Sequence, residues 1–181
     1  MIESVIEKKI SMENPVTIAP DQFLAALSSH EKQLYNFILK CLRGHEDAQD
    51  IYQTTVLKAF RGIRRFQGRS SFKTWLFAIA GNEVRRHFRK QKRDGLLLKS
   101  ARENPPMQSS SPDPQLAAIQ ELAATLDPRY RQVFFLFYYN GFSISEIVGI
   151  TGIKTGTIKY ILNNCREKIK SRLGVNQNET G

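Results

Sequence analysis

A row of arginine side chains is the first feature of this sequence that could do chemistry. Within a predicted helix over residues 72–90 and just beyond it, one face carries Trp75, Ala78, Asn82, Arg85, Arg86, Arg89 and Arg93. The other face is apolar and is expected in the core, with Leu76, Ile79, Ala80, Val84 and Phe88. Guanidinium groups at this density repel one another, so we expect a counter-charge, and phosphate groups would supply it.

A short polar loop, Phe66-Gln67-Gly68-Arg69-Ser70-Ser71-Phe72, comes directly before this helix. Ser70 or Ser71 is suited to cap the helix, because a serine hydroxyl accepts hydrogen bonds from free backbone amides. Small polar residues beside a basic helix with an aromatic ring are also what a protein needs to hold an unstacked base. The loop and Trp75 are therefore either an ordinary cap with a core tryptophan or part of a single-strand binding surface, and the tryptophan can serve both.

The positive charge of the chain is concentrated in one segment. The 181 residues carry a net charge of +10. Residues 58–93 hold twelve Lys or Arg and one acid, Glu83, which gives +11, whereas residues 1–57, with five basic and eight acidic side chains, sum to −3. A solvated face usually mixes both signs, so this segregation favours a polyanionic partner, either nucleic acid or an anionic membrane surface.

The residue types that usually carry catalysis or bind metals are scattered. His30, His45 and His87 lie far apart, and the two cysteines, Cys41 and Cys165, cannot complete a four-ligand zinc site. The basic segment contains no acidic pair. We expect no enzyme activity, no metal and no cofactor, and we expect both cysteines to be reduced thiols of a cytoplasmic protein.

Composition divides the chain into two helical parts. The stretch between Arg93 and Leu116 holds four of the seven prolines, which is typical of an extended linker. We predict an all-α fold with a first domain over residues 21–93, a flexible linker over 94–113 and a second domain over 114–173. Residues 1–20 and 174–181 are predicted to be disordered ends. The longest apolar run is far below the roughly 20 residues that cross a bilayer, so no membrane insertion is expected.

A further helix of the first domain starts near Ala48 and carries two distinct stripes. The expected core stripe consists of Ile51, Tyr52, Val56, Ala59 and Phe60. The other stripe is polar apart from one leucine and consists of Asp47, Asp50, Gln53, Thr54 and Leu57. Residue types alone are compatible with a solvent face and with a protein-binding face here. The carboxylates could also chelate a metal ion, although acids three residues apart more often belong to such faces.

The second domain contains the pattern of a helix-turn-helix. Asp127-Pro128 is a cap and start signal for one helix, and Ser143 with Glu146 forms a capping box for a short helix. A turn with Gly152 follows, and a long final helix begins after Lys154. The residues that would fill the helix crossing are Ile147, Val148, Ile153, Ile158 and Ile161 or Leu162. A tight helical hairpin with no role in DNA binding has the same pattern.

Two segments, in order, resemble the extracytoplasmic-function group of sigma factors in the sigma-70 family. Residues 47–60, DAQDIYQTTVLKAF, and residues 66–76, FQGRSSFKTWL, look like the second conserved region of that group. The segment from LDPRYR at residue 126 through GTIK at residue 159 is similar to the fourth region. The resemblance extends over residues 30–93 and 115–173, with a linker where a third region would stand.

The resemblance implies promoter recognition together with bacterial core RNA polymerase, in the cytoplasm, with an anti-sigma factor as a further partner. The residues it implies for polymerase binding are Asp47, Asp50, Gln53, Thr54 and Leu57. Those it implies for holding and melting the −10 element are Gly68, Arg69, Ser70, Ser71, Phe72, Trp75, Asn82, Arg85, Arg86 and Arg89. Those it implies for the −35 element, on the recognition helix, are Thr155, Thr157, Lys159, Tyr160, Asn163 and Arg166.

The recognition helix departs from the family pattern after Lys159. Relatives usually carry further basic residues there, whereas this chain has Ile161, Asn163 and Asn164, and Tyr160 replaces a small residue. Asparagine can read adenine edges, so the departure implies either an altered base preference or a weaker grip on phosphates.

Two other functions are compatible with parts of the sequence. A stand-alone helix-turn-helix regulator that binds duplex DNA would explain residues 126–173 but would leave the first domain without a role. A nucleic-acid enzyme such as a recombinase would need catalytic carboxylates in the basic region, and the carboxylate cluster instead lies in the acidic segment.

Overall fold

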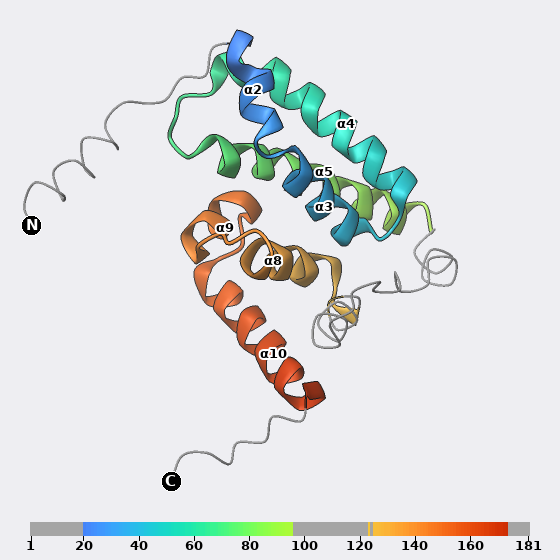
Figure 1. Cartoon of the computed structure of the whole chain (residues 1–181). Helices are drawn as coiled ribbons and strands as arrows, with labels where there is room; N and C mark the ends of the chain where they lie inside the picture. The colour runs from blue at the N-terminus through green and yellow to red at the C-terminus, as the bar shows by residue number, and fades with distance from the viewer. Residues whose placement is uncertain (1–19, 96–122, 124, 174–181) are drawn as a thin grey trace, which may run out of the picture.

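The chain folds into helices that form an upper and a lower layer in Figure 1. A computed structural model describes residues 20–95, 123 and 125–173, and every regular element within these residues is a helix. The first half comprises η1 (Pro20–Gln22), α2 (Phe23–Ser28), α3 (Glu31–Leu42), α4 (His45–Gly62), η2 (Ile63–Arg65) and α5 (Phe72–Arg93). The second half comprises α8 (Pro128–Tyr138), α9 (Ile144–Thr151) and α10 (Thr155–Leu173). The all-α prediction is confirmed.

The predicted linker and chain ends fall mostly outside the described residues. Residues 1–19, residues 96–113 of the linker and residues 174–181 are not among those described. Pro20 begins η1, and residues 94–95 follow α5 as a turn.

The helix boundaries follow from local capping chemistry. The Ser71 hydroxyl accepts a hydrogen bond from the Thr74 backbone amide at 3.1 Å, so of the two candidate serines it is Ser71 that caps α5. Asp127 caps α8, accepting from the Arg129 amide at 2.9 Å, with proline at the first helical position. These caps confirm the start signals predicted for both helices.

The helix-turn-helix is also built as its sequence predicts. The Ser143 hydroxyl accepts from the Glu146 amide at 3.3 Å, and the Glu146 carboxylate accepts from the Ser143 amide at 2.9 Å, which completes the capping box of α9. Helix α9 ends at Thr151 and is capped by Gly152, whose φ of 70° lies in the left-handed region that suits glycine. Ile158, Ile161 and Leu162 are buried where α10 packs on α8 and α9.

One predicted core residue of α4 is exposed. Ala48 and Ala59 of α4 are fully buried, and Ile51 and Val56 pack against the core at its edge. Phe60 is instead 52% exposed, and its ring meets Phe23 of α2 edge-on at 5.5 Å between centroids. The prediction that Phe60 is a core residue is therefore wrong, because α2 is a six-residue helix that meets this ring at its edge.

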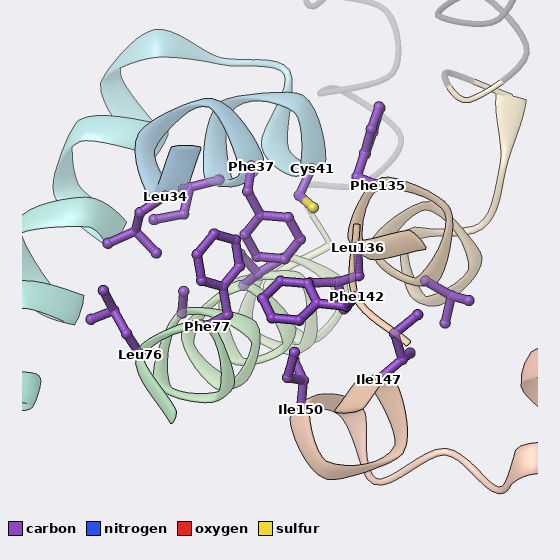
Figure 2. Close-up of a cluster of buried hydrophobic side chains, with 14 of the residues drawn as sticks. Leu34, Phe37, Cys41, Leu76, Phe77, Phe135, Leu136, Phe142, Ile147 and Ile150 are labelled. Carbon is purple, nitrogen blue, oxygen red and sulfur yellow. The ribbon is translucent and has the colours of Figure 1, made fainter. Parts of the chain in front are cut away.

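The two halves of the chain share one hydrophobic core. Figure 2 shows Phe37 of α3 and Phe77 of α5 facing Phe142, with Ile147 and Ile150 of α9 completing the cluster. The rings of Phe77 and Phe142 lie 5.0 Å apart in an edge-to-face arrangement. The helix that carries the arginine row, α5, is therefore packed against the helix-turn-helix.

Candidate nucleic-acid interface

The loop before α5 leads into a cluster of aromatic rings. The ring centroid of Trp75 lies 5.0 Å from that of Phe66 and 5.8 Å from that of Phe72, and Trp75 is half-buried. Gly68 has a φ of 64°, which a residue with a side chain rarely adopts. Arg69 and Ser70 are exposed beside these rings. The loop thus presents polar groups next to an aromatic wall, and Trp75 contributes to the core while keeping an accessible edge.

The arginines of α5 do not share one environment. Arg86 and Arg89 are exposed, whereas Arg85 is half-buried. Arg85 donates to the Asn82 side-chain oxygen, to Gln132 Oε1 at 3.1 Å and to the Ile150 carbonyl at 3.4 Å. Burial, followed by the positive charges of Arg89 and Arg129, lowers the pKa of Arg85. An anionic partner would relieve this repulsion.

A single buried acid lies beneath the basic face of α5. Glu83 is 7% exposed, and its carboxylate pairs with Lys58 Nζ of α4 at 2.5 Å. Arg86 Nη1 lies 3.9 Å from the other carboxylate oxygen. This acid joins α4 to α5. Arg93 pairs with its neighbour Asp94 at 3.1 Å, whereas Arg89 takes part in none of the ion pairs of the described residues.

The polar stripe of α4 lies along the outside of the first half. Asp50, Gln53 and Leu57 are exposed, and Leu57 keeps 55% of its surface accessible. Thr54 is intermediate. A single accessible leucine among acids and amides is compatible with a solvent face and with a protein-binding face.

The amino-terminal end of this stripe contacts α5 through a histidine. Asp47 Oδ2 lies 3.6 Å from Nε2 of His87, whose side chain is 15% exposed. Burial lowers the pKa of His87, Asp47 raises it and Lys90 lowers it, and the net shift is downward. His87 is therefore neutral at physiological pH, and sequence spacing gave no sign of its proximity to Asp47.

The predicted face of α10 is accessible along its length. Thr155, Thr157, Lys159, Tyr160, Asn163 and Arg166 are all exposed. Tyr160 keeps 60% of its surface accessible, whereas Ile161 is 1% exposed. Ile161 is thus a core residue, so its presence in place of a basic residue removes nothing from the exposed face.

Several polar residues that join the halves were not identified from sequence. Arg131 is buried and donates to the Ala123 and Leu126 carbonyls and, across the halves, to the Cys41 carbonyl at 3.0 Å. Gln132 is 1% exposed and donates to the Gly81 carbonyl at 2.9 Å. Their position directly before the apolar run over residues 133–137 was the available signal, since buried polar side chains need specific partners.

Within residues 20–95 and 125–173, no group of three His, Cys, Asp or Glu side chains is placed to hold a metal ion. In the same part of the chain no helix is both long enough and apolar enough to span a bilayer.

Both halves match known families. The model of sigma-70 region 2 matches residues 26–94, and the model of sigma-70 region 4 matches residues 116–169. We call these two parts region 2 and region 4.

Similar proteins extend over most of the chain. It is 31% identical over 163 residues to the ECF RNA polymerase sigma factor EcfG of Rhodopseudomonas palustris, covering 86% of this chain and 84% of the relative. It is 28% identical over 167 residues to the ECF RNA polymerase sigma factor SigW of Bacillus subtilis, covering 84% of this chain and 89% of the relative. The solved structure of the sigma factor RpoE of Bartonella quintana, in complex with the anti-sigma factor NepR, superposes with a TM-score of 0.69 at 26% identity, covering 86% of this chain and 99% of that one. A chain with both regions in this order, similar to such relatives along most of its length, belongs to the ECF group of RNA polymerase sigma factors, which direct transcription initiation and are not themselves enzymes.

Proposed function

We propose that this sigma factor divides promoter recognition between its two regions while α4 holds the core polymerase. In this proposal residues 21–93 bind polymerase and the −10 element, residues 114–173 bind the −35 element, and residues 94–113 connect them. The linker then runs near the polymerase active-site channel and the RNA exit path. Promoter recognition would take place in the cytoplasm, where core polymerase and promoter DNA are found.

The polymerase-binding role of the α4 stripe rests on its accessibility and composition. Asp50, Gln53 and Leu57 are exposed on one helix, with Asp47 and Thr54 at intermediate exposure beside them. An acidic and apolar surface would suit a basic and apolar helix of the polymerase, because complementary charge orients the encounter and the leucine fills a pocket.

The single-strand role of region 2 rests on the polar loop, the accessible edge of Trp75 and the exposed cations Arg86 and Arg89. Opening a duplex costs a few kcal/mol for each unstacked step, and binding offsets this cost only if the separated strand is held better than the duplex. Asn82 and the loop over Gly68–Phe72 would hold a flipped base, while Arg85, Arg86 and Arg89 would hold the backbone.

The −35 role of region 4 rests on the exposed face of α10. Thr155 and Thr157 lie at the start of the helix, where recognition helices usually meet base edges, and Lys159 and Arg166 would contact phosphates. Tyr160 and Asn163 lie on the same accessible side. Asn163 would favour adenine in the major groove.

An anti-sigma factor is a further proposed partner. The support is the similarity to RpoE of Bartonella quintana, which is solved with the anti-sigma factor NepR. Co-purification from cells, followed by a competition assay against core polymerase, tests this partner.

The polymerase interface is tested by charge reversal. Asp50→Arg with Gln53→Ala should abolish co-purification with core polymerase while leaving helicity unchanged, because both side chains are exposed and make no core contact. Glu167→Arg, a matched reversal of an exposed acid on α10, should keep polymerase binding. Retained binding by the α4 variant would contradict the interface, and promoter binding without polymerase would favour a stand-alone regulator.

The melting role is tested by separating duplex binding from strand opening. Asn82→Ala and serine-to-alanine changes in the loop should reduce open-complex formation on a promoter more than they reduce binding to duplex DNA. Permanganate reactivity of thymines reports opening, and a mobility shift reports binding. An equal loss of both would indicate ordinary backbone contacts.

A further inference from the structure

We propose that the carboxyl-terminal end of α4 forms a phosphate-binding surface for the separated DNA strand, with Arg61, Arg64 and Arg65 as its contacts. We call these three residues the α4 cations. None of them is among the residues that the family resemblance implies for DNA binding. The inference rests on the strand-holding role proposed above for region 2, and it extends that role from the loop and α5 to a third element.

Helix α4 changes the sign of its charge along its length. Residues 45–57 carry Glu46, Asp47 and Asp50 and no lysine or arginine. Residues 58–65, which are the end of α4 together with η2, carry Lys58 and the α4 cations and no acid. The acidic part suits a basic partner, and the basic part suits an anionic one. Cations in the last turn also stabilise a helix through its dipole, so the experiment must separate binding from stability.

The α4 cations are not neutralised by nearby acids. All three are exposed, and none takes part in the ion pairs of the described residues. Lys58, one turn earlier, is instead paired with the buried Glu83 of α5. Like charges at this spacing repel one another. An anion that binds from outside would remove this repulsion and form charge-assisted hydrogen bonds with the guanidinium groups.

The segment that carries these cations contacts the indole of Trp75. A Cβ atom added at Gly62 would lie 3.3 Å from Trp75 Cζ2, and the ring centroid of Phe66 lies 5.0 Å from that of Trp75. Arg61 directly precedes Gly62 in the chain, and Arg65 directly precedes Phe66. Figure 1 shows this segment at the left end of the upper layer, where the chain passes from α4 to α5. Free cations and a partly accessible aromatic ring therefore lie at the same end of region 2.

The combination of an aromatic ring with free cations fits a separated strand better than a duplex. A single strand offers unstacked base faces and phosphates to the same surface, whereas the bases of a duplex are stacked on one another. The accessible edge of Trp75 would contact a base, while Arg61 and Arg65 would hold the neighbouring phosphates. The exposed Arg86 and Arg89 of α5 would continue the contact further along the strand.

The test is the salt dependence of strand binding by the full chain. The probe is a single-stranded DNA of random sequence and about 20 nucleotides, long enough for several phosphate contacts. The fluorescence of Trp75, the only tryptophan of the sequence, reports binding. Each phosphate contact to a single strand contributes about 0.7 to the slope of log K against log salt concentration. Arg61→Gln with Arg65→Gln should therefore reduce this slope by about 1.4 and weaken binding about tenfold at about 0.1 M salt.

Lys32→Gln is the matched control and should leave the slope unchanged, because Lys32 is an exposed cation of α3 that takes part in none of the ion pairs of the described residues.

Three results would contradict the inference, and each has its own signature. If the double variant has a lower melting temperature but the wild-type slope, the α4 cations serve only the stability of the helix. If the variant loses as much affinity for a duplex of the same length, the contact is not specific to the separated strand. If the wild-type chain does not bind the probe, the strand-holding role proposed above fails as well, whereas wild-type binding with an unchanged variant slope overturns this inference alone.

Discussion

Lys58 of α4 and Glu83 of α5 form an ion pair with 2.5 Å between Nζ and Oε1. The pair joins the helix proposed to bind polymerase to the helix proposed to bind DNA. Glu83 is also the one acid in residues 58–93, so it offsets part of the repulsion among the surrounding cations.

Replacing this acid by its neutral isostere should destabilise region 2. We expect Glu83→Gln to lower the free energy of unfolding by about 1–2 kcal/mol, because Lys58 loses a charged partner but is itself partly exposed. Urea denaturation followed by circular dichroism measures this. Glu167→Gln, which removes an exposed pair with Lys170 at 3.5 Å, should change stability by less than about 0.5 kcal/mol. Equal effects of the two changes would contradict the structural role of Glu83.

Acid should weaken the fold through His87. Because the folded chain lowers the pKa of His87 from 6.5, chiefly by burial, the folded state binds this proton less readily than the unfolded state. The stability that neutral His87 confers is therefore complete above pH 6.5 and is lost as the pH falls through the lower, folded pKa.

The measurement is the melting temperature across this pH range. His87→Gln should flatten the loss of stability between about pH 7 and 5. Burial also lowers the pKa of His30, so the double variant with His30→Gln should flatten it further. An unchanged slope in His87→Gln would show that protonation of His87 does not oppose folding.

Two glycines of the helix-turn-helix should respond to alanine with opposite signs. Gly152 has a φ of 70°, so Gly152→Ala should cost about 1 kcal/mol or more in stability. Gly149 lies within α9 and its added Cβ meets nothing within 4 Å, so Gly149→Ala should stabilise by about 0.5–1 kcal/mol. Thermal unfolding measures both, and a stabilising Gly152→Ala would contradict the left-handed turn.

Trp75 should matter for both stability and strand binding. We expect Trp75→Ala to lower the free energy of unfolding by about 2–3 kcal/mol, less than for a fully buried ring, and Trp75→Phe to lower it by about 1 kcal/mol. Since Trp75 is the only tryptophan of the sequence, its fluorescence should change when single-stranded DNA binds the loop. An unchanged free energy of unfolding in Trp75→Ala would mean that the aromatic cluster contributes little to stability.

Helix α5 illustrates what periodicity predicts and what it misses. Its predicted inward residues Leu76, Ala80 and Val84 are buried, because period-3.6 apolar residues must find a core. Phe77 and Gly81 are buried as well, against region 4. A helix that packs on two sides has no single polar face. The packing of α5 against region 4 depends on contacts between residues far apart in the sequence, which the periodicity of α5 does not encode. The same reason places Arg85 between the regions and Arg86 outside.

The starts of helices α5, α8 and α9 could be predicted from local sequence signals. Ser71, Asp127 and the Ser143–Glu146 box need only neighbouring backbone amides, so their spacing was sufficient. The exposure of the α10 residues followed from periodicity in the same way. The partner of Gln132 depends on how two helices cross, which no local pattern encodes.

The reactivity of the Cys41 thiol can report the contact between the two regions. Cys41 is fully buried, burial raises the pKa of its thiol to about 12 although Arg131 opposes this, and Figure 2 places it beside Phe135 of α8. Its thiolate fraction at neutral pH is negligible. Alkylation of the Cys41 thiol should therefore require that α8 moves away from α3. If holoenzyme assembly separates the two regions, the alkylation rate reports that assembly without an added label.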